Sequence, residues 1–209
     1  KLSTAQKFID KQLVDAAKKY EHIVRLKGGD PMIFGRADEE IVALQEHDIA
    51  FEVVPGITCA LAAAASVQSS LTLRGVSRSV AFVTMAKADQ TISVDEIPKA
   101  DTLIYYMGRK DGQRIAAQLI QAGRAIDTPV VVVESISTAK ERKLFTNLQR
   151  LHEGLLSEWS NPDAPAILMI GDAFSRVKEQ QTRLDDLCFS EMDDRLQDLI
   201  TLTNSRRCA

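Results

Sequence analysis

The sequence predicts an α/β fold built from two units, and three observations support this prediction. Amphipathic helical stretches alternate with short apolar runs of strand length along the chain. Glycine and proline pairs follow two of these runs, where a strand would give way to a loop. The chain has 209 residues, of which 45% are hydrophobic and 26% charged, so it can bury a sizeable core. Alternation of this kind favours parallel strands joined by crossover helices.

The first half of the chain contains three predicted helices and two predicted strands. Apolar residues recur at helical spacing over Thr4 to Tyr20, which indicates a helix lying on a core. Ile23 to Leu26 and Phe51 to Val54 are the predicted strands. A second helix is expected from Asp38 to Glu46, because its first residues are acidic and lie at the positive end of the helix dipole. The third is an alanine-rich helix that follows Thr58 and reaches Ser69.

Four apolar runs predict the strands of a second α/β unit. They are Val80 to Met85, Thr102 to Met107, Val130 to Val133 and Ile167 to Ile170. Predicted helices lie between them at residues 113–122 and 147–159. Gly75-Val76-Ser77 separates the two halves, so we predict one domain at residues 1–76 and a second at residues 77–174. Residues 175–209 carry leucines among many charges and are predicted to form a helical tail.

Charge and composition argue against several classes of partner and site. The 26 Lys and Arg against 29 Asp and Glu give a net charge of -3, which provides no overall attraction for nucleic acid or anionic lipid. No apolar run is long enough to span a membrane and no signal peptide is apparent, so we expect a cytoplasmic protein. The three cysteines and three histidines lack metal-ligand spacing, and no metal site is predicted. The chain also lacks the motifs of serine hydrolases, P-loop nucleotidases and dinucleotide oxidoreductases.

Two loops that follow predicted strands are candidates for a ligand site. The first is Gly-Gly-Asp-Pro at residues 28–31, and the second is Pro-Gly-Ile-Thr at residues 55–58. In open α/β sheets the ligand binds at the carboxyl ends of the strands. Paired glycines allow a ligand to approach the backbone, and Asp30 can accept hydrogen bonds from ribose hydroxyls. An ordinary turn and a helix cap explain the same residues without a ligand.

Arg36 and Glu39 are a further candidate for a binding or catalytic site. They are three residues apart, so on a helix their side chains face the same way. As an exposed ion pair they would contribute only about 0.3 kcal/mol. Alternatively, the Arg36 guanidinium presents a planar fork of donors to a carboxylate, while Glu39 orients it or exchanges protons. Arg74 offers a second fork of the same kind.

Three motifs in order resemble those of the uroporphyrinogen-III C-methyltransferases, which are tetrapyrrole methylases. The first is Val-Arg-Leu-Lys-Gly-Gly-Asp-Pro at residues 24–31, continued by Phe-Gly-Arg at 34–36 and Glu-Glu at 39–40. The second is Val-Val-Pro-Gly-Ile-Thr at residues 53–58, and the third is Leu-Thr-Leu-Arg-Gly at residues 71–75. The resemblance continues through Tyr-Tyr-Met-Gly at residues 105–108 and spans residues 4–174.

This resemblance implies the tetrapyrrole methylase fold, in which two α/β domains hold S-adenosylmethionine in the cleft between them, in a homodimer. It implies transfer of methyl groups to C2 and then C7 of uroporphyrinogen III. The products would be precorrin-2 and S-adenosylhomocysteine, in siroheme or cobalamin biosynthesis. Methylation of a later corrinoid precursor is the alternative within the same fold.

The resemblance also implies individual roles, residue by residue. It assigns cofactor contacts to Gly28, Gly29, Asp30, Ile33, Thr58, Cys59, Met107 and Ile136. Asp30 would hold the ribose. Cys59 and Ile136 stand where the family commonly has smaller residues, so contacts through the backbone are expected there. Arg36, Glu39 and Arg74 are assigned to the substrate, whose eight carboxylates suit arginine, and Arg36 and Glu39 are the catalytic candidates.

One departure from the family pattern concerns proton transfer. In the family this role belongs to the aspartate of a Gly-x-Gly-Pro-Gly-Asp loop and to a following lysine, and these 209 residues contain neither. Residues 1–6 are similar to the segment just after that lysine, so we expect a first domain that lacks the family's first strands. Removing core strands from a natural enzyme would expose apolar faces and unpaired edges, which favours truncation over a naturally shortened chain. A non-catalytic dimerisation or ligand-binding module is therefore a further alternative.

Overall fold

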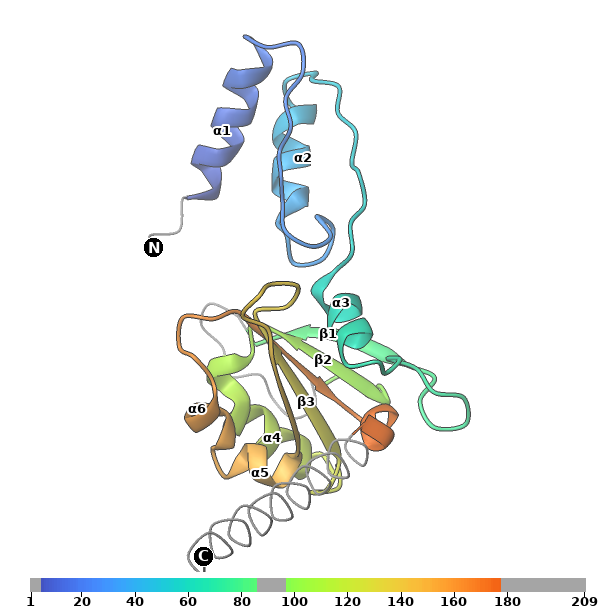
Figure 1. The fold of residues 1–209 in the computed structure, drawn as a ribbon. Helices are drawn as coiled ribbons and strands as arrows, with labels where there is room; N and C mark the ends of the chain where they lie inside the picture. The colour runs from blue at the N-terminus through green and yellow to red at the C-terminus, as the bar shows by residue number, and fades with distance from the viewer. Residues whose placement is uncertain (1–4, 86–96, 178–209) are drawn as a thin grey trace, which may run out of the picture. The chain divides into compact units, whose positions relative to one another are not determined.

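The computed structural model describes residues 5–85 and 97–177 (Figure 1). Contacts divide the chain into two compact units, Lys1–Ala62 and Ala63–Ala209. The division falls within helix α3 (Cys59–Ser66), ahead of the boundary expected near Gly75. Most of the predicted tail lies outside the described residues. Among the described helices, none has the length and hydropathy needed to cross a membrane.

Two helices form the packed part of the first unit. They are α1 (Gln6–Ala17) and α2 (Ala37–Gln45). The two helices contact each other and lie side by side in Figure 1. Three acidic residues occupy the first turn of α2, where their charges favour the helix dipole. Both helices confirm the sequence prediction, although α1 is shorter at each end than the apolar pattern indicated.

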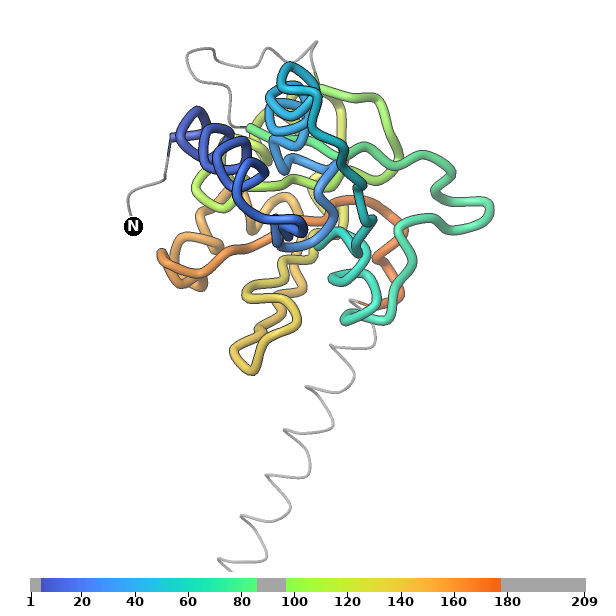
Figure 2. Tube along the Cα trace, turned by 90° about the horizontal axis from the view of Figure 1, so that it is seen from above, coloured from blue at the N-terminus to red at the C-terminus, as the bar shows by residue number. Residues whose placement is uncertain are grey.

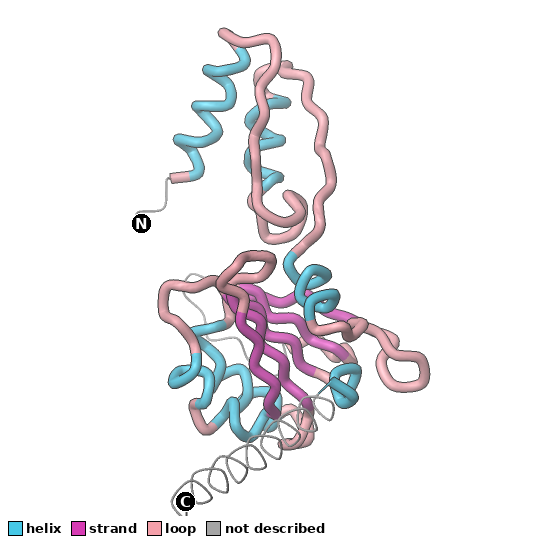
Figure 3. Tube along the Cα trace, in the orientation of Figure 1, coloured by secondary structure: helices cyan, strands magenta, loops and turns pink. Residues whose placement is uncertain are grey.

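The two strands predicted in the first unit are absent from the described structure, and that prediction was wrong. Residues 23–26 and 51–54 are drawn as loop in Figure 3, and neither forms a hydrogen-bonded ladder. A strand requires a partner that pairs with its N–H and C=O groups, and the described residues supply none here. As a result Val24 is 84% exposed, Leu26 83% and Val54 73%.

The second unit is built around a five-stranded sheet with the order β1-β2-β5-β3-β4. The strands are β1 (Val80–Thr84), β2 (Thr102–Tyr106), β3 (Pro129–Glu134), β4 (Arg142–Asn147) and β5 (Ala166–Ile170). Four of them confirm the predicted strands. The sequence analysis missed β4, because this edge strand carries exposed polar residues in place of an apolar run.

The sheet is mixed, which corrects the expectation of parallel strands. Only β1 and β2 pair in parallel, whereas β2 with β5, β5 with β3, and β3 with β4 are antiparallel. Strand β5 lies between β2 and β3 and is antiparallel to both. These two strands therefore run in the same direction. Tyr106 and Val133 both pair with Ile167, which places the carboxyl ends of β2 and β3 at one edge of the sheet.

The core of the second unit lies between the sheet and a layer of helices. These are α4 (Gly112–Gln121), α5 (Leu148–His152) and α6 (Leu155–Trp159), which Figure 1 shows together on one side of the sheet. Fully buried leucine, isoleucine and valine side chains from both layers fill the space between them. Two short 3-10 helices, Arg109–Asp111 and Asp172–Phe174, follow β2 and β5. The helix predicted over residues 147–159 is in fact two, because Gly154 between them has a φ of 98°.

Candidate functional site

Asp30 joins the two candidate loops of the first unit. Its Oδ2 accepts a hydrogen bond from the Gly56 backbone N–H at 3.0 Å, and its Oδ1 accepts one from the Met32 N–H at 2.8 Å. The second bond closes a tight turn around residues 30–32. The first bond links the Gly-Gly-Asp-Pro loop to the Pro-Gly-Ile-Thr loop across 26 residues of sequence. The predicted proximity of these loops is therefore observed.

Glycines allow the backbones of these two loops to touch. A Cβ on Gly56 would overlap the carbonyl oxygen of Gly29, so only glycine fits at this position. Gly29 itself has a φ of +73°, and a Cβ there would lie 3.8 Å from the Thr58 Cα. Gly28, in contrast, has open space where a side chain would be. The loops thus form one surface of backbone atoms that is open at Gly28.

The loop at residues 55–58 leads directly into helix α3. Thr58 is buried, and its carbonyl oxygen accepts hydrogen bonds from the N–H groups of Leu61 at 3.0 Å and Ala62 at 3.2 Å. Cys59 is the first residue of α3. Ile33 closes the first loop through a bond of 3.4 Å from its N–H to the Asp30 carbonyl. Six of the eight predicted cofactor residues, those numbered 28 to 59, therefore lie in or beside the two joined loops of the first unit.

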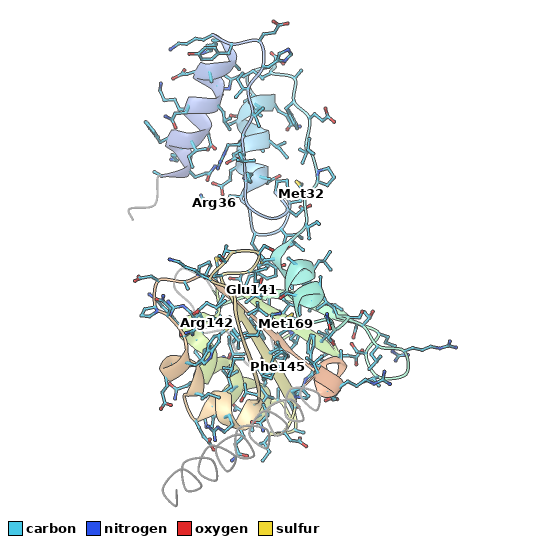
Figure 4. All side chains as sticks on the ribbon, viewed as in Figure 1. Met32, Arg36, Glu141, Arg142, Phe145 and Met169 are labelled. Atoms are coloured by element: carbon cyan, nitrogen blue, oxygen red, sulfur yellow. The ribbon has the colours of Figure 1, made fainter. Side chains whose placement is uncertain are left out.

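Arg36 and Glu39 form a two-bond ion pair where α2 begins. The Arg36 Nε and Nη2 atoms each donate to a different Glu39 oxygen at 2.7 Å. Figure 4 shows Arg36 and Met32 at the same end of the first unit. Hydrogen bonding to Arg36 lowers the pKa of the Glu39 carboxyl, and the same bonds raise the pKa of Arg36. Both side chains are exposed, so the pair presents a fixed guanidinium to solvent.

The backbone around Arg36 is held in an unusual conformation. Phe34 and Arg36 have positive φ values of 50° and 55°. A Cβ on Gly35, between them, would overlap the carbonyl oxygen of Pro31. Left-handed backbone at a non-glycine residue costs roughly 1–2 kcal/mol. Such strain is typical of functional sites.

Glu40 is a buried carboxylate that the sequence analysis did not identify. It accepts hydrogen bonds from Gln6 Nε2 at 3.2 Å, Arg25 Nε at 3.2 Å and Lys27 Nζ at 2.9 Å. Burial alone would raise the pKa of Glu40, but the bonds from Lys27 and Gln6 and the two positive charges lower it. The signal was available: residues 25 and 27 of an extended segment face the same way. This network ties α1, α2 and the first loop together.

Met107 and Ile136 follow the two strands whose ends share one sheet edge. Met107 comes directly after β2 and is 57% exposed, while Ile136 lies two residues beyond the end of β3. Only β5 separates β2 from β3, so these strand ends are roughly 10 Å apart. The second unit therefore brings its two predicted cofactor residues to the same edge.

Backbone strain marks this edge as well. Met107 has a φ of 57°, and Ile136 lies between Ser135 and Ser137 with φ values of 52° and 61°. In the described ranges seven non-glycine residues have positive φ, and five of them belong to or adjoin the predicted site. The other two, Asp48 and Gln68, follow helix ends, where this conformation is common.

Arg74 lies in the second unit, apart in sequence from the other substrate candidates. It is part of a tight turn in which the Ser77 N–H donates to the Leu73 carbonyl at 2.7 Å. Figures 1 and 2 both show residues 73–77 standing out from the sheet. The predicted site residues are thus divided between the units. Within the first unit the structure joins the two loops, and within the second it places Met107 and Ile136 at one sheet edge, whereas Arg74 lies in a separate turn.

A second buried carboxylate, Glu134, lies at the end of β3. Its Oε2 lies 3.0 Å from Arg142 Nε, and its Oε1 accepts the Asn161 N–H at 2.8 Å. The Arg142 guanidinium also lies over the Trp159 ring, 4.3 Å from its centre. These contacts bind the end of β3 to β4 and to the loop before β5. They therefore support the sheet edge that carries Ile136.

Comparison with known proteins gives relatives along most of the chain. It is 37% identical to a siroheme synthase of Hydrogenovibrio crunogenus, over 87% of this chain and 39% of that protein. It is 38% identical to the uroporphyrinogen-III C-methyltransferase of Bacillus subtilis, over 80% of this chain and 66% of that protein. The chain thus spans about two fifths or less of the siroheme synthases it matches.

Solved structures agree with the sequence comparison. Uroporphyrin-III C-methyltransferase from Thermus thermophilus, in complex with S-adenosylhomocysteine, matches with a TM-score of 0.71 and 33% identity. The match covers 81% of this chain and 74% of that one. The five-stranded mixed sheet and its helices therefore correspond to the fold of that enzyme. The family model described as tetrapyrrole (corrin/porphyrin) methylases matches residues 1–152. This chain therefore belongs to the tetrapyrrole methylases, enzymes that use S-adenosylmethionine as the methyl donor.

Proposed function

We propose that this chain binds S-adenosylmethionine and methylates uroporphyrinogen III at C2 and then C7, giving precorrin-2. The observation that carries the proposal is the Asp30 to Gly56 hydrogen bond. It joins the two family motifs into one surface of backbone atoms, at residues that the family resemblance assigns to the cofactor. By the same resemblance, we propose a homodimer that works in the cytoplasm on the siroheme or cobalamin route.

The loops of the first unit suit a nucleoside. Each Asp30 oxygen accepts one backbone N–H, and a carboxylate oxygen has a further lone pair that can accept a ribose hydroxyl. Gly28 leaves open space in front of the backbone, as close approach of a ligand requires. Gly28, Gly29, Asp30, Ile33, Thr58 and Cys59 would hold the nucleoside, with Met107 and Ile136 contributing from the second unit. When bound, S-adenosylmethionine supplies the electrophilic methyl group.

The substrate side of the proposal depends on Arg36. Two of its five N–H donors are used by Glu39, which leaves three for a carboxylate of the macrocycle. Glu39 fixes the plane of the guanidinium, so less side-chain freedom is lost when the substrate binds. Arg74 supplies a second guanidinium in the second unit. These cations explain how a chain with a net charge of -3 can recognise a substrate with eight carboxylates.

Methyl transfer demands mainly that the two reacting carbons be aligned and kept away from water. The strained turns at Arg36, Met107 and Ile136 are suited to this task, because their backbone conformations are fixed before the ligands arrive. We assign Arg36 and Glu39 to orienting the macrocycle through its carboxylates. The joined loops orient the methyl donor.

The experiment is an activity assay on the full-length protein with S-adenosylmethionine and purified uroporphyrinogen III. Mass spectrometry should show the mono-methylated and then the dimethylated product. A product formed only from a later corrinoid precursor would replace the proposed substrate with that alternative. Binding of S-adenosylhomocysteine without any methylated product would support a ligand-binding module. Failure to bind it would contradict the proposal as a whole.

A further inference from the structure

The turn between β3 and β4 is held in place by one carboxylate, that of Glu141. Its Oε2 accepts the Ser137 backbone N–H at 2.8 Å, across the turn that presents Ile136. The Glu141 N–H in turn donates to the Thr138 carbonyl at 3.1 Å. Ser137 is one of the two left-handed residues that flank Ile136. Glu141 therefore stabilises the strained conformation on one side of this predicted cofactor residue.

The same carboxylate reaches the end of helix α3. The Ser66 hydroxyl donates a short hydrogen bond to Glu141 Oε1, although 75 residues separate the two in sequence. Lys143 donates from Nζ to the Ser66 carbonyl at 2.7 Å and lies 3.6 Å from Glu141 Oε1. A cation at the last carbonyl of a helix also favours the helix dipole. The hydroxyl and the carbonyl of Ser66 are thus both bound to residues at the β4 end of the turn.

These contacts join the last residue of α3 to the turn that carries Ile136, within the second unit. Helix α3 has eight residues and starts directly after Thr58. Its last residue, Ser66, is bound to Glu141, which in turn holds the turn carrying Ile136. No contact of Glu141 with substrate or cofactor is needed for this effect. Its role is to fix the backbone on which such contacts depend.

We propose that Glu141 is a positioning residue for the methyl donor, because its carboxylate fastens the Ile136 turn to the end of helix α3. This inference rests on the proposed function, since it takes Ile136 and Thr58 as cofactor contacts. It adds a residue that neither the family motifs nor the charge pattern pointed to. Lys143 and Ser66 complete the cluster.

The test compares variants of this cluster by their affinity for S-adenosylhomocysteine, measured by calorimetry on the full-length protein. Glu141→Ala removes both acceptors and should weaken binding about tenfold, because hydrogen bonds to a charged group are lost. Glu141→Gln retains one acceptor oxygen and should recover part of that loss. Ser66→Ala breaks only the bond to the hydroxyl and should give a smaller effect. Glu158→Ala, an exposed glutamate on α6, is the matched control and should bind like the wild type.

The double variant Ser66→Ala/Glu141→Ala distinguishes a coupled cluster from two separate effects. If the two residues act through one contact, the double variant should bind no more weakly than Glu141→Ala alone. The melting temperature of each variant is measured in parallel, and a purely structural role would lower it without the graded loss of affinity. If every variant bound S-adenosylhomocysteine as tightly as the wild type, the positioning role of Glu141 would be overturned and the proposed function would stand. No binding by the wild type would overturn this inference together with the proposed function.

Discussion

At the scale of single residues, Asp30 does more than a turn residue requires. An aspartate at the start of a tight turn normally bonds one backbone N–H close by in sequence, as Asp30 does with Met32. Its second bond, to Gly56, has no role within the turn and instead joins it to a separate loop. The residue type therefore serves both the local turn and the assembly of the site.

Asp30→Asn should separate these two roles. The side-chain oxygen of asparagine can still accept a hydrogen bond from the Met32 N–H. Its NH2 group would then face the Gly56 N–H, and two donors cannot form a hydrogen bond. We expect the free energy of unfolding to fall by about 1–3 kcal/mol and S-adenosylhomocysteine binding to weaken at least tenfold. Equilibrium dialysis measures the binding. Asp163→Asn, at an exposed loop position, is the control, and equal affinities for the two variants would contradict the role of Asp30.

Glu40 leads to a prediction for the pH dependence of stability. Its pKa in the folded chain lies below the ordinary value of 4.5, so its ion pairs contribute fully above that value. The contribution is lost as the pH falls from 4.5 through the lowered pKa. The free energy of unfolding of Glu40→Gln should be about 2 kcal/mol lower at neutral pH, because the ion pairs with Arg25 and Lys27 are lost while these two cations remain.

Chemical denaturation of both proteins between pH 7 and about pH 3 measures this contribution. The gap in unfolding free energy between wild type and Glu40→Gln should stay constant at neutral pH and shrink in acid. A gap that does not change with pH would show that the carboxylate charge is unimportant. Glu46→Gln, at the exposed residue directly after α2, controls for removing an acidic side chain beside the same helix.

At the scale of elements, the strands that could be predicted from the sequence are those with apolar runs, because such runs indicate burial. The apolar runs of β2, β3 and β5 are buried along their whole length and were found. The edge strand β4 was missed because its pairing depends on β3 and not on its own composition. Residues 23–26 and 51–54 have strand composition yet no ladder, since pairing is a property of two segments.

The candidate site was predictable to a similar extent. Loop residues such as Gly29 and Asp30 carry local signals and recognisable motifs, so they could be named from the sequence. The carboxylates of Glu134 and Glu141 could not be distinguished from the other acidic residues, because Asn161 and Ser66, which they bind, are distant in sequence. The left-handed backbone at Met107 and Ser135 likewise depends on the packed sheet edge.

Hydrogen exchange tests the correction to the predicted strands. Backbone N–H groups of residues 23–26 and 51–54 have no ladder partners in the described structure, so they should exchange rapidly. Amides of β3, which is paired on both sides, should exchange slowest in the chain. The measurement is mass spectrometry of peptides from residues 1–209 after timed exposure to deuterated water. Equal protection of residues 51–54 and β3 would show that these segments are paired after all.

At the scale of the whole molecule, the predicted site residues are distributed over the two units. The first unit joins its loops through Asp30 and fixes Arg36 with Glu39. The second unit places Met107 and Ile136 at one sheet edge and fastens the latter through Glu141. The proposed function requires one S-adenosylmethionine to contact residues of both units.

Hydrogen exchange with and without S-adenosylhomocysteine tests that claim most directly. The account predicts that added ligand slows exchange in three places at once: at residues 28–33, at residues 56–59, and at the edge formed by residues 107 and 135–137. The turn at residues 73–77 should be unaffected, because Arg74 is assigned to the macrocycle and not to the methyl donor. Protection limited to one unit, or confined to residues outside these segments, would contradict the shared site.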